Sequence, residues 1–263
     1  MPRSVVSPAS AMKLGMLAFA VAALLASPDA HADEAQAKAL VKAMSDYMAA
    51  QKSISFQYDT SLEVVTPDDQ KLAIVSSGTA TIARPDRIRA TRTGGFADVE
   101  LVFDGKTLTL LGKNAKLYGQ AEVPGTVDHL VDELREKFHV PVPGADLLMS
   151  DVYGVLMADV TDSKDLGSGV IRGKECDHLA FRTEEADWQI WIAQGNEPFP
   201  CRYEITSRKV RGYPEYVLDV HDWKASTDAS MADFSFTPPQ GAKQVKPGEL
   251  TDIDELPNIY QSK

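Results

Sequence analysis

The sequence predicts an α+β fold built on a strongly curved antiparallel sheet of about ten or eleven strands, a half-barrel with helices over its concave face. Short segments of alternating apolar residues recur at hairpin spacing along most of the chain. Amphipathic helical segments stand only at the start and in the middle. So large a sheet must curl because strand twist accumulates, and so few helices can cover only one of its faces.

The N-terminal segment predicts export. Leu14 to Ala26 is an uncharged apolar run of thirteen residues, preceded by Arg3 and Lys13 and followed by Ala30-His31-Ala32, which is typical of a secretory signal peptide. A membrane-spanning helix needs about 20 such residues. We therefore expect residues 1–32 to be a cleaved signal peptide and residues 33–263 to form a single domain. The expected product is a monomeric periplasmic protein that can touch a membrane transiently but is not integral to it.

The charge balance narrows the choice of partner. The chain has 27 basic and 38 acidic residues, a net charge of −11. This sign opposes contact with phosphate backbones, so nucleic acid is not an expected partner.

The first mature element is predicted to be a helix over Asp33–Gln51, with Ala39, Leu40, Ala43, Met44, Tyr47 and Met48 on its apolar face. The spacing of apolar residues then changes from a helical to a strand period. Apolar or β-favouring residues alternate strictly from Ile54 to Val64, which predicts a strand with one buried face.

Five further strands follow in the first half, and each is bounded by turn residues such as Pro85-Asp86 or Asp104-Gly105. They are expected from Leu72 to Ile82 and at Arg87–Thr93, Asp98–Phe103, Thr107–Leu111 and Lys116–Gly119.

The middle of the chain is predicted to be helical. Thr126 caps an amphipathic helix, and a second short helical stretch lies over Leu147–Met157. Both carry apolar residues that could cover the opening of the half-barrel. Five more strands are expected from about Val160 to Trp223.

Cys176 and Cys201 could form one disulfide in an oxidising compartment, or could remain as two free buried cysteines. They begin the first and third strands of a predicted meander, at the same end of the sheet. In a flat sheet these strands lie roughly 9.6 Å apart, beyond the ~7 Å that a disulfide spans, so a bridge requires a bend at the sheet end.

No catalytic cluster, metal site or cofactor motif is evident. The histidines show none of the close spacings that place two imidazoles on one metal. Gly167-Ser168-Gly169 matches neither a nucleophile elbow nor a phosphate loop. We therefore expect a protein that is not an enzyme.

Apolar residues of the strands and of the helical insert are the candidates for binding a ligand. Each could also be ordinary core, the usual fate of alternating apolar residues. The sheet, however, presents more apolar area than two short helices can cover, so we expect a hydrophobic cavity. The candidates are Phe56, Tyr58, Leu62, Ile74, Ile88, Leu101, Phe103, Leu108, Leu110, Leu130, Leu134, Phe138, Leu148, Met157, Trp188 and Ile190.

Arg84, Arg87, Arg89 and Arg92 form one basic cluster in an acidic chain. Alternation places Arg87 and Arg89 on the face opposite Ile88. They could form surface ion pairs or contact an anionic head group or a partner.

The stretches from Gly78 to Arg89 (GTATIARPDRIR) and from Phe103 to Leu108 (FDGKTL) resemble motifs of the lipoprotein carrier (LolA/LolB-like) superfamily. More closely, the chain resembles the predicted periplasmic family called domain of unknown function 2092. The segments Pro143–Leu148, Asp187–Ile192 and Phe234–Ala242 also fit that family. The resemblance implies a half-barrel with a helical lid and a hydrophobic cavity, and for the carriers it implies transport of acylated lipoproteins.

Two functions are therefore expected. The first is a periplasmic, non-enzymatic carrier or binding protein for a lipophilic small molecule, lipid or acyl chain. The second is an envelope protein-interaction or stress-sensing module with the same fold, whose partner is a protein.

Overall fold

The computed structural model describes residues 30–140, 142–230, 232–251 and 253. The predicted signal peptide lies outside these residues up to position 29, and the expected cleavage point after Ala32 falls in the first turn of the first helix. No helix in these ranges is long and apolar enough to cross a membrane.

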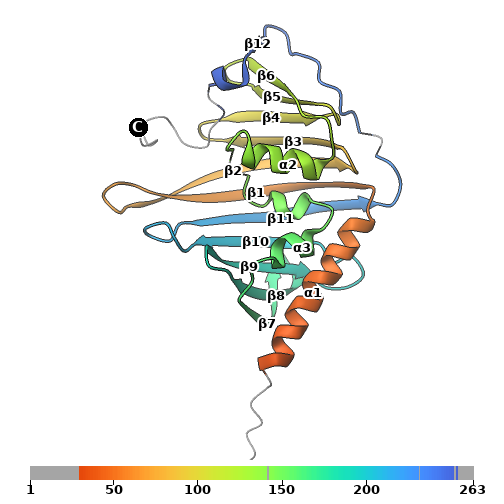
Figure 1. Cartoon of the computed structure of the whole chain (residues 1–263), viewed down its shortest axis with the longest axis vertical. Coiled ribbons are helices and arrows are strands. Elements are labelled where there is room, and N and C mark those ends of the chain that lie inside the picture. The colour runs from red at the N-terminus through yellow and green to blue at the C-terminus, as the bar shows by residue number, and fades with distance from the viewer. Residues whose placement is uncertain (1–29, 141, 231, 252, 254–263) are drawn as a thin grey trace, which may run out of the picture.

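One open sheet, antiparallel except at its β12 edge, dominates the structure, with helices lying over one of its faces, as predicted (Figure 1). The helices are α1 (Ala30–Ala50), α2 (Val127–Glu136), η1 (Ala145–Leu148), α3 (Val152–Met157) and η2 (Pro247–Glu249). The strands of the first half are β1 (Ser53–Val65), β2 (Lys71–Ala83), β3 (Arg87–Gly94), β4 (Asp98–Phe103), β5 (Thr107–Gly112) and β6 (Leu117–Glu122). Those of the second half are β7 (Asp162–Ile171), β8 (Lys174–Arg182), β9 (Ala186–Ala193), β10 (Pro200–Ser207), β11 (Glu215–Ser226) and β12 (Lys243–Val245).

The sheet is made of two meanders joined side by side. Its strand order is β12-β6-β5-β4-β3-β2-β1-β11-β10-β9-β8-β7. The β1–β11 pairing joins the halves, and the segment between β6 and β7 carries α2, η1 and α3 across the sheet. Because β12 and β7 stand at opposite ends of this order, the curved sheet does not close into a barrel.

The predicted count of ten or eleven strands was short by β12. This strand has only three residues and pairs parallel with the β6 edge, Lys243 opposite Leu117 and Val245 opposite Gly119. Three residues are too few to show alternation, and a parallel edge pairing has no turn signal in the sequence.

Alternation sorts the side chains as predicted for β1. Positions that share a register pair point to the same face of a sheet. One row of such pairs runs over five strands and is buried beneath the helices: Ile54, Ile82, Ile88, Phe103 and Leu108. We call the face that carries this row the inner face, and the opposite face the outer face.

Helix α1 packs on the inner face over β7 and beside α3 (Figure 1). Its buried side chains are Ala37, Val41, Met44, Ser45 and Met48. The predicted apolar face was therefore wrong for Ala39 and Ala43, which are exposed. Ser45 takes a buried place because its hydroxyl oxygen accepts a hydrogen bond from the Tyr153 N–H at 3.0 Å, which ties α1 to α3.

The C-terminal segment wraps around the β6 edge of the sheet (Figure 1). On the outer face, Phe236 contacts Tyr118 with ring centroids 5.1 Å apart, and the Asp233 carbonyl accepts from Arg89. Strand β12 then pairs with the edge, and η2 follows on the other side of it. We call residues 243–251 together with Ile253 the strap.

Candidate functional site

The predicted ligand-binding residues lie on the inner face of the sheet or on the segment from α2 to α3, which we call the lid. Eight are buried: Phe56, Ile88, Phe103, Leu108, Leu130, Leu134, Trp188 and Ile190. Eight are half-buried: Tyr58, Leu62, Ile74, Leu101, Leu110, Phe138, Leu148 and Met157. Only Leu62, Ile74 and Leu110 stand apart from the hydrophobic cluster that the others share.

The lid is held to the sheet by a few polar contacts at one end of the inner face. The Val127 N–H donates to the Pro85 carbonyl at 2.9 Å, and the Arg84 guanidinium donates to the Met149 carbonyl at 3.2 Å. Burial lowers the pKa of Arg84, and the nearby carboxylate of Asp128 opposes that shift. These contacts join the turn between β2 and β3 to the first residue of α2 and to the residue that follows η1.

Two further contacts hold the lid together internally. The Ser150 N–H donates to the Asp128 carboxylate at 2.9 Å, and Arg135 forms an ion pair with Asp146 at 2.7 Å. Thr126 caps α2 as predicted, accepting from the His129 N–H at 3.2 Å. The lid is therefore held in place by a few individual hydrogen bonds and one ion pair, as well as by the packing of its apolar face.

The four arginines of the basic cluster have different roles. Arg89 lies on the outer face and pairs with Glu100 at 2.7 Å, and Arg87 lies 3.8 Å from Asp86. Arg84 contacts the lid, whereas Arg92 donates to the Ile253 carbonyl of the strap at 2.7 Å. No local sequence signal indicates these last two contacts, because their partners lie far along the chain.

Tyr58 is fixed in the middle of the inner face. Its hydroxyl donates to the Thr91 carbonyl at 2.9 Å, and its ring lies over Gly78. A Cβ atom at Gly78 would lie 2.0 Å from the Thr91 carbonyl oxygen and 2.6 Å from the Tyr58 ring. Glycine is therefore required here so that the tyrosine can cross β2.

Neither of the two hollows that stand out on the described residues is the predicted apolar cavity. The first has a volume of about 530 Å³ and lies on the outer face, lined among others by Asp59, Ser61, Val75, Ser77 and Asp219. The second is about 10 Å³, between Val75 and Phe96. Inner-face side chains instead pack against one another and against the lid.

Charged and hydroxyl side chains stand among the residues that line the outer-face hollow. Asp59 and Asp219 are register partners on β1 and β11. A hydrogen bond from Ser77 holds the pKa of Asp59 below its ordinary value, and Arg172 and His221 add to this effect. No group of three or more metal-binding side chains occurs within the described ranges.

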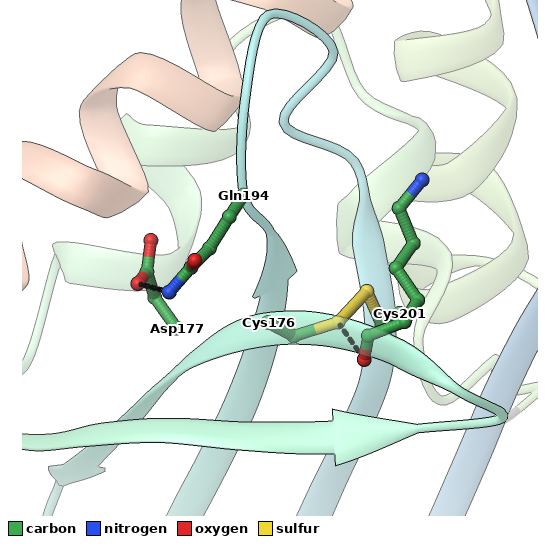
Figure 2. Close-up of a disulfide and its surroundings, with 5 residues drawn as sticks. Cys176, Asp177, Gln194 and Cys201 are labelled. Atoms are coloured by element: carbon green, nitrogen blue, oxygen red, sulfur yellow. Dashed lines mark hydrogen bonds between the residues drawn. A yellow bond between two sulfur atoms is a disulfide. The ribbon is translucent and has the colours of Figure 1, made fainter.

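A disulfide joins Cys176 on β8 to Cys201 on β10, across the end of β9 (Figure 2). The Cα atoms are 7.0 Å apart, closer than two strand spacings of a flat sheet. The reason is a bulge, since the β9–β10 register shifts between Pro200 and Arg202 and leaves Cys201 as the extra residue. Gln194 donates to Asp177 at 2.7 Å beside the bridge.

A family model described as "Predicted periplasmic protein (DUF2092)" matches residues 37–246. No curated protein matches the chain at a significant level.

Several solved structures resemble this one at low identity. LprF from Mycobacterium bovis is 12% identical, with a TM-score of 0.46, covering 80% of this chain and 99% of its own. An uncharacterised conserved protein from Thermus thermophilus is 12% identical, with a TM-score of 0.45 and the same coverage of 80% and 99%. A LolA superfamily protein from Nitrosomonas europaea is 12% identical, with a TM-score of 0.33, covering 72% and 92%. Because these values are low, the function has to be inferred from this chain's own geometry.

Proposed function

This chain belongs to the DUF2092 family of predicted periplasmic proteins, as its motifs indicated, and from that premise we propose that it is a non-enzymatic binding or carrier protein for a lipophilic ligand. The ligand is a lipid or an acyl chain, and it lies on the inner face of the sheet. Helix α1, the lid and the strap are the parts of the chain that share this face with it.

The observation that carries the proposal is that apolar side chains remain half-buried at two places on the inner face. Register pairs place Leu101 beside Leu110, and Leu62 beside Ile74. All four side chains are partly exposed, although their neighbours under the lid are buried. Leu101 and Leu110 adjoin the buried row under the lid and provide a floor for an acyl chain, whereas Leu62 and Ile74 lie further along β1 and β2, beyond Thr60 and Ser76. We call the Leu101–Leu110 pair with its surroundings the half-buried apolar zone.

Access for a whole acyl chain requires movement, because the side chains under the lid are in mutual contact. Burying a chain of about 16 carbons gains on the order of 10 kcal/mol at ~0.8 kcal/mol per CH₂, before ordering is subtracted. A buried polar contact contributes only about 0.5–1.5 kcal/mol net. The gain therefore exceeds the cost of breaking the few polar contacts that hold the lid to the sheet.

Native mass spectrometry of the mature protein, purified gently from the periplasm, tests the proposal. We expect one co-purified lipid per protein, and reduced retention in a Leu101→Asp variant. Leu166→Asp is the matched control, because Leu166 is exposed on β7 and lies away from the zone. Absence of lipid, or equal retention in a folded Leu101→Asp variant, would contradict the proposal.

A second candidate function, docking of an envelope protein, is favoured by a separate observation. Val75 and Phe96 are large apolar side chains that are 65% and 46% exposed, and both line the small hollow between β2 and the β3–β4 turn. Adjacent exposed apolar groups are typical of an interaction surface. If the same native spectra show a stoichiometric protein partner that a Phe96→Ser variant loses, the second function is supported in place of the first.

A further inference from the structure

The strap lies on the inner face of β5 and β6, where two glycines make room for it. Gly119 is the register partner of Leu110, so a side chain at this position would point to the inner face. A Cβ atom at Gly119 would lie 3.0 Å from Leu250 Cδ1, and one at Gly112 would lie 3.2 Å from Ile253 Cγ2. Leu250 and Ile253 therefore rest directly on strand backbone, beside the half-buried apolar zone.

The strap has few attachments. Strand β12 contributes three residues of parallel pairing, and the Lys243 N–H donates to the Lys116 carbonyl at 2.9 Å. The Gln244 side-chain amide donates to the Gln120 side-chain oxygen at 3.0 Å. Arg92 donates to the Ile253 carbonyl at 2.7 Å. No residue of η2 is buried, and both Leu250 and Ile253 remain half-buried. A short edge strand with little buried apolar area is expected to open at low free energy.

We propose that the strap is an internal occupant of the apolar ligand site, which an acyl chain displaces when it binds. This inference rests on the proposed function and adds a regulatory element to it. Leu250 and Ile253 cover the same face as Leu110, with the kind of apolar contact that a hydrocarbon chain would make. Ligand and strap then exclude each other at β5 and β6.

Mutual exclusion has a thermodynamic consequence. If ligand binding requires release of the strap, the observed affinity equals the intrinsic affinity multiplied by the fraction of molecules in which the strap is released. Loosening the strap should therefore strengthen binding. Binding should in turn expose the backbone amides of β12, because the two equilibria are linked.

The test uses the full mature chain and oleate as the probe. A Leu250→Ser/Ile253→Ser variant is compared with wild type and with a Leu166→Ser/Val170→Ser control, whose residues are exposed on the opposite edge strand, β7. We expect the strap variant to bind oleate about 3- to 10-fold more tightly, while the control matches wild type. In wild type, oleate should increase hydrogen exchange of residues 243–251.

The hydrogen-exchange measurement needs no variant, so it stands even if the substitutions disturb folding. If oleate binds wild type but leaves exchange in the strap unchanged, or if the strap variant binds equally or more weakly, the inference is wrong and the proposed function stands. If the Leu166→Ser/Val170→Ser control also binds oleate more tightly, the effect comes from a general loss of stability and not from the strap, and the inference is wrong. If oleate does not bind wild type at all, both proposals fail.

Discussion

At the scale of single residues, the contact between Tyr58 and Gly78 explains a motif position. Gly78 is the glycine that opens the GTATIARPDRIR stretch, and the Tyr58 ring crosses β2 over it to reach the Thr91 carbonyl. Any side chain at position 78 would collide with backbone as well as with the ring. Backbone cannot move aside as a flexible side chain can.

The first prediction follows from this contact. Gly78→Ala should lower the free energy of unfolding by about 1–3 kcal/mol or more, the usual range for overpacking. Gly95→Ala is the control, because a Cβ there meets nothing within 4 Å, and its effect should be near zero. Urea denaturation measures both. Equal stability of the two variants would contradict the claim that there is no room for a side chain at position 78.

The second prediction concerns Glu204 on the outer face. Burial raises the pKa of its carboxyl, and Glu215 raises it further, while Arg202 opposes the shift. The folded state therefore binds the proton more tightly than the unfolded chain, and the charged form destabilises the fold. The loss of stability from the charged Glu204 is therefore absent below the pKa that this carboxyl has in the unfolded chain, about 4.3. It is fully present above the higher pKa that the carboxyl has in the folded protein.

Glu204→Gln should consequently raise the melting temperature at neutral pH, with little effect near pH 4. The amide retains an oxygen that can accept the hydrogen bond from Gln189. Glu185→Gln, at a side chain that is 75% exposed, is the control and should change little at either pH. Thermal unfolding across this range is the measurement. A lower melting temperature of Glu204→Gln than of wild type at pH 7 would contradict the claim that the charged Glu204 destabilises the fold.

Residue roles were predictable where they depend on local alternation. The inner placement of Phe56 and Phe103 follows from strand period alone. The roles of Arg84 and Arg92 were not predictable, because their acceptors are carbonyls 65 and 161 positions away. Such partners depend on how the lid and the strap fold back onto the sheet.

At the scale of elements, the long strands and the lid were predictable from their periods and their turn residues. The position of helix α1 was predicted, but two of its exposed residues, Ala39 and Ala43, were assigned to its apolar face. Alanines at helical spacing do not distinguish a packed face from a solvent-exposed face. Strand β12 was missed because it exists only as an addition to the β6 edge. The bulge that brings Cys201 toward Cys176 likewise has no signal in sequence.

The third prediction concerns the bridge between β8 and β10. The two cysteines are 25 positions apart. Closing a loop of that length should stabilise the fold by roughly 3–4 kcal/mol in the chain-entropy model. A Cys176→Ala/Cys201→Ala variant should lose about this much in urea denaturation. A loss of less than about 1 kcal/mol would show that the bridge does little to restrict the unfolded chain.

At the scale of the whole molecule, the curved sheet with helices on one face follows from the size of the sheet and the shortage of helices. The sequence reasoning went further and expected an empty apolar cavity. In the structure, helix α1, the lid and the strap lie over the inner face, and the buried side chains there are in contact with one another. The cavity itself stays a prediction. Which segments of the chain cover that face is a matter of tertiary packing, which strand alternation cannot reveal.

The central claim is that an acyl chain binds on the inner face. Amide NMR of the mature protein with spin-labelled stearate tests it most directly. We predict line broadening at Tyr58, Leu101, Leu110 and the lid, while the amides around Val75 and Phe96 stay sharp. Broadening confined to Val75 and Phe96, or none at saturating stearate, would contradict the claim.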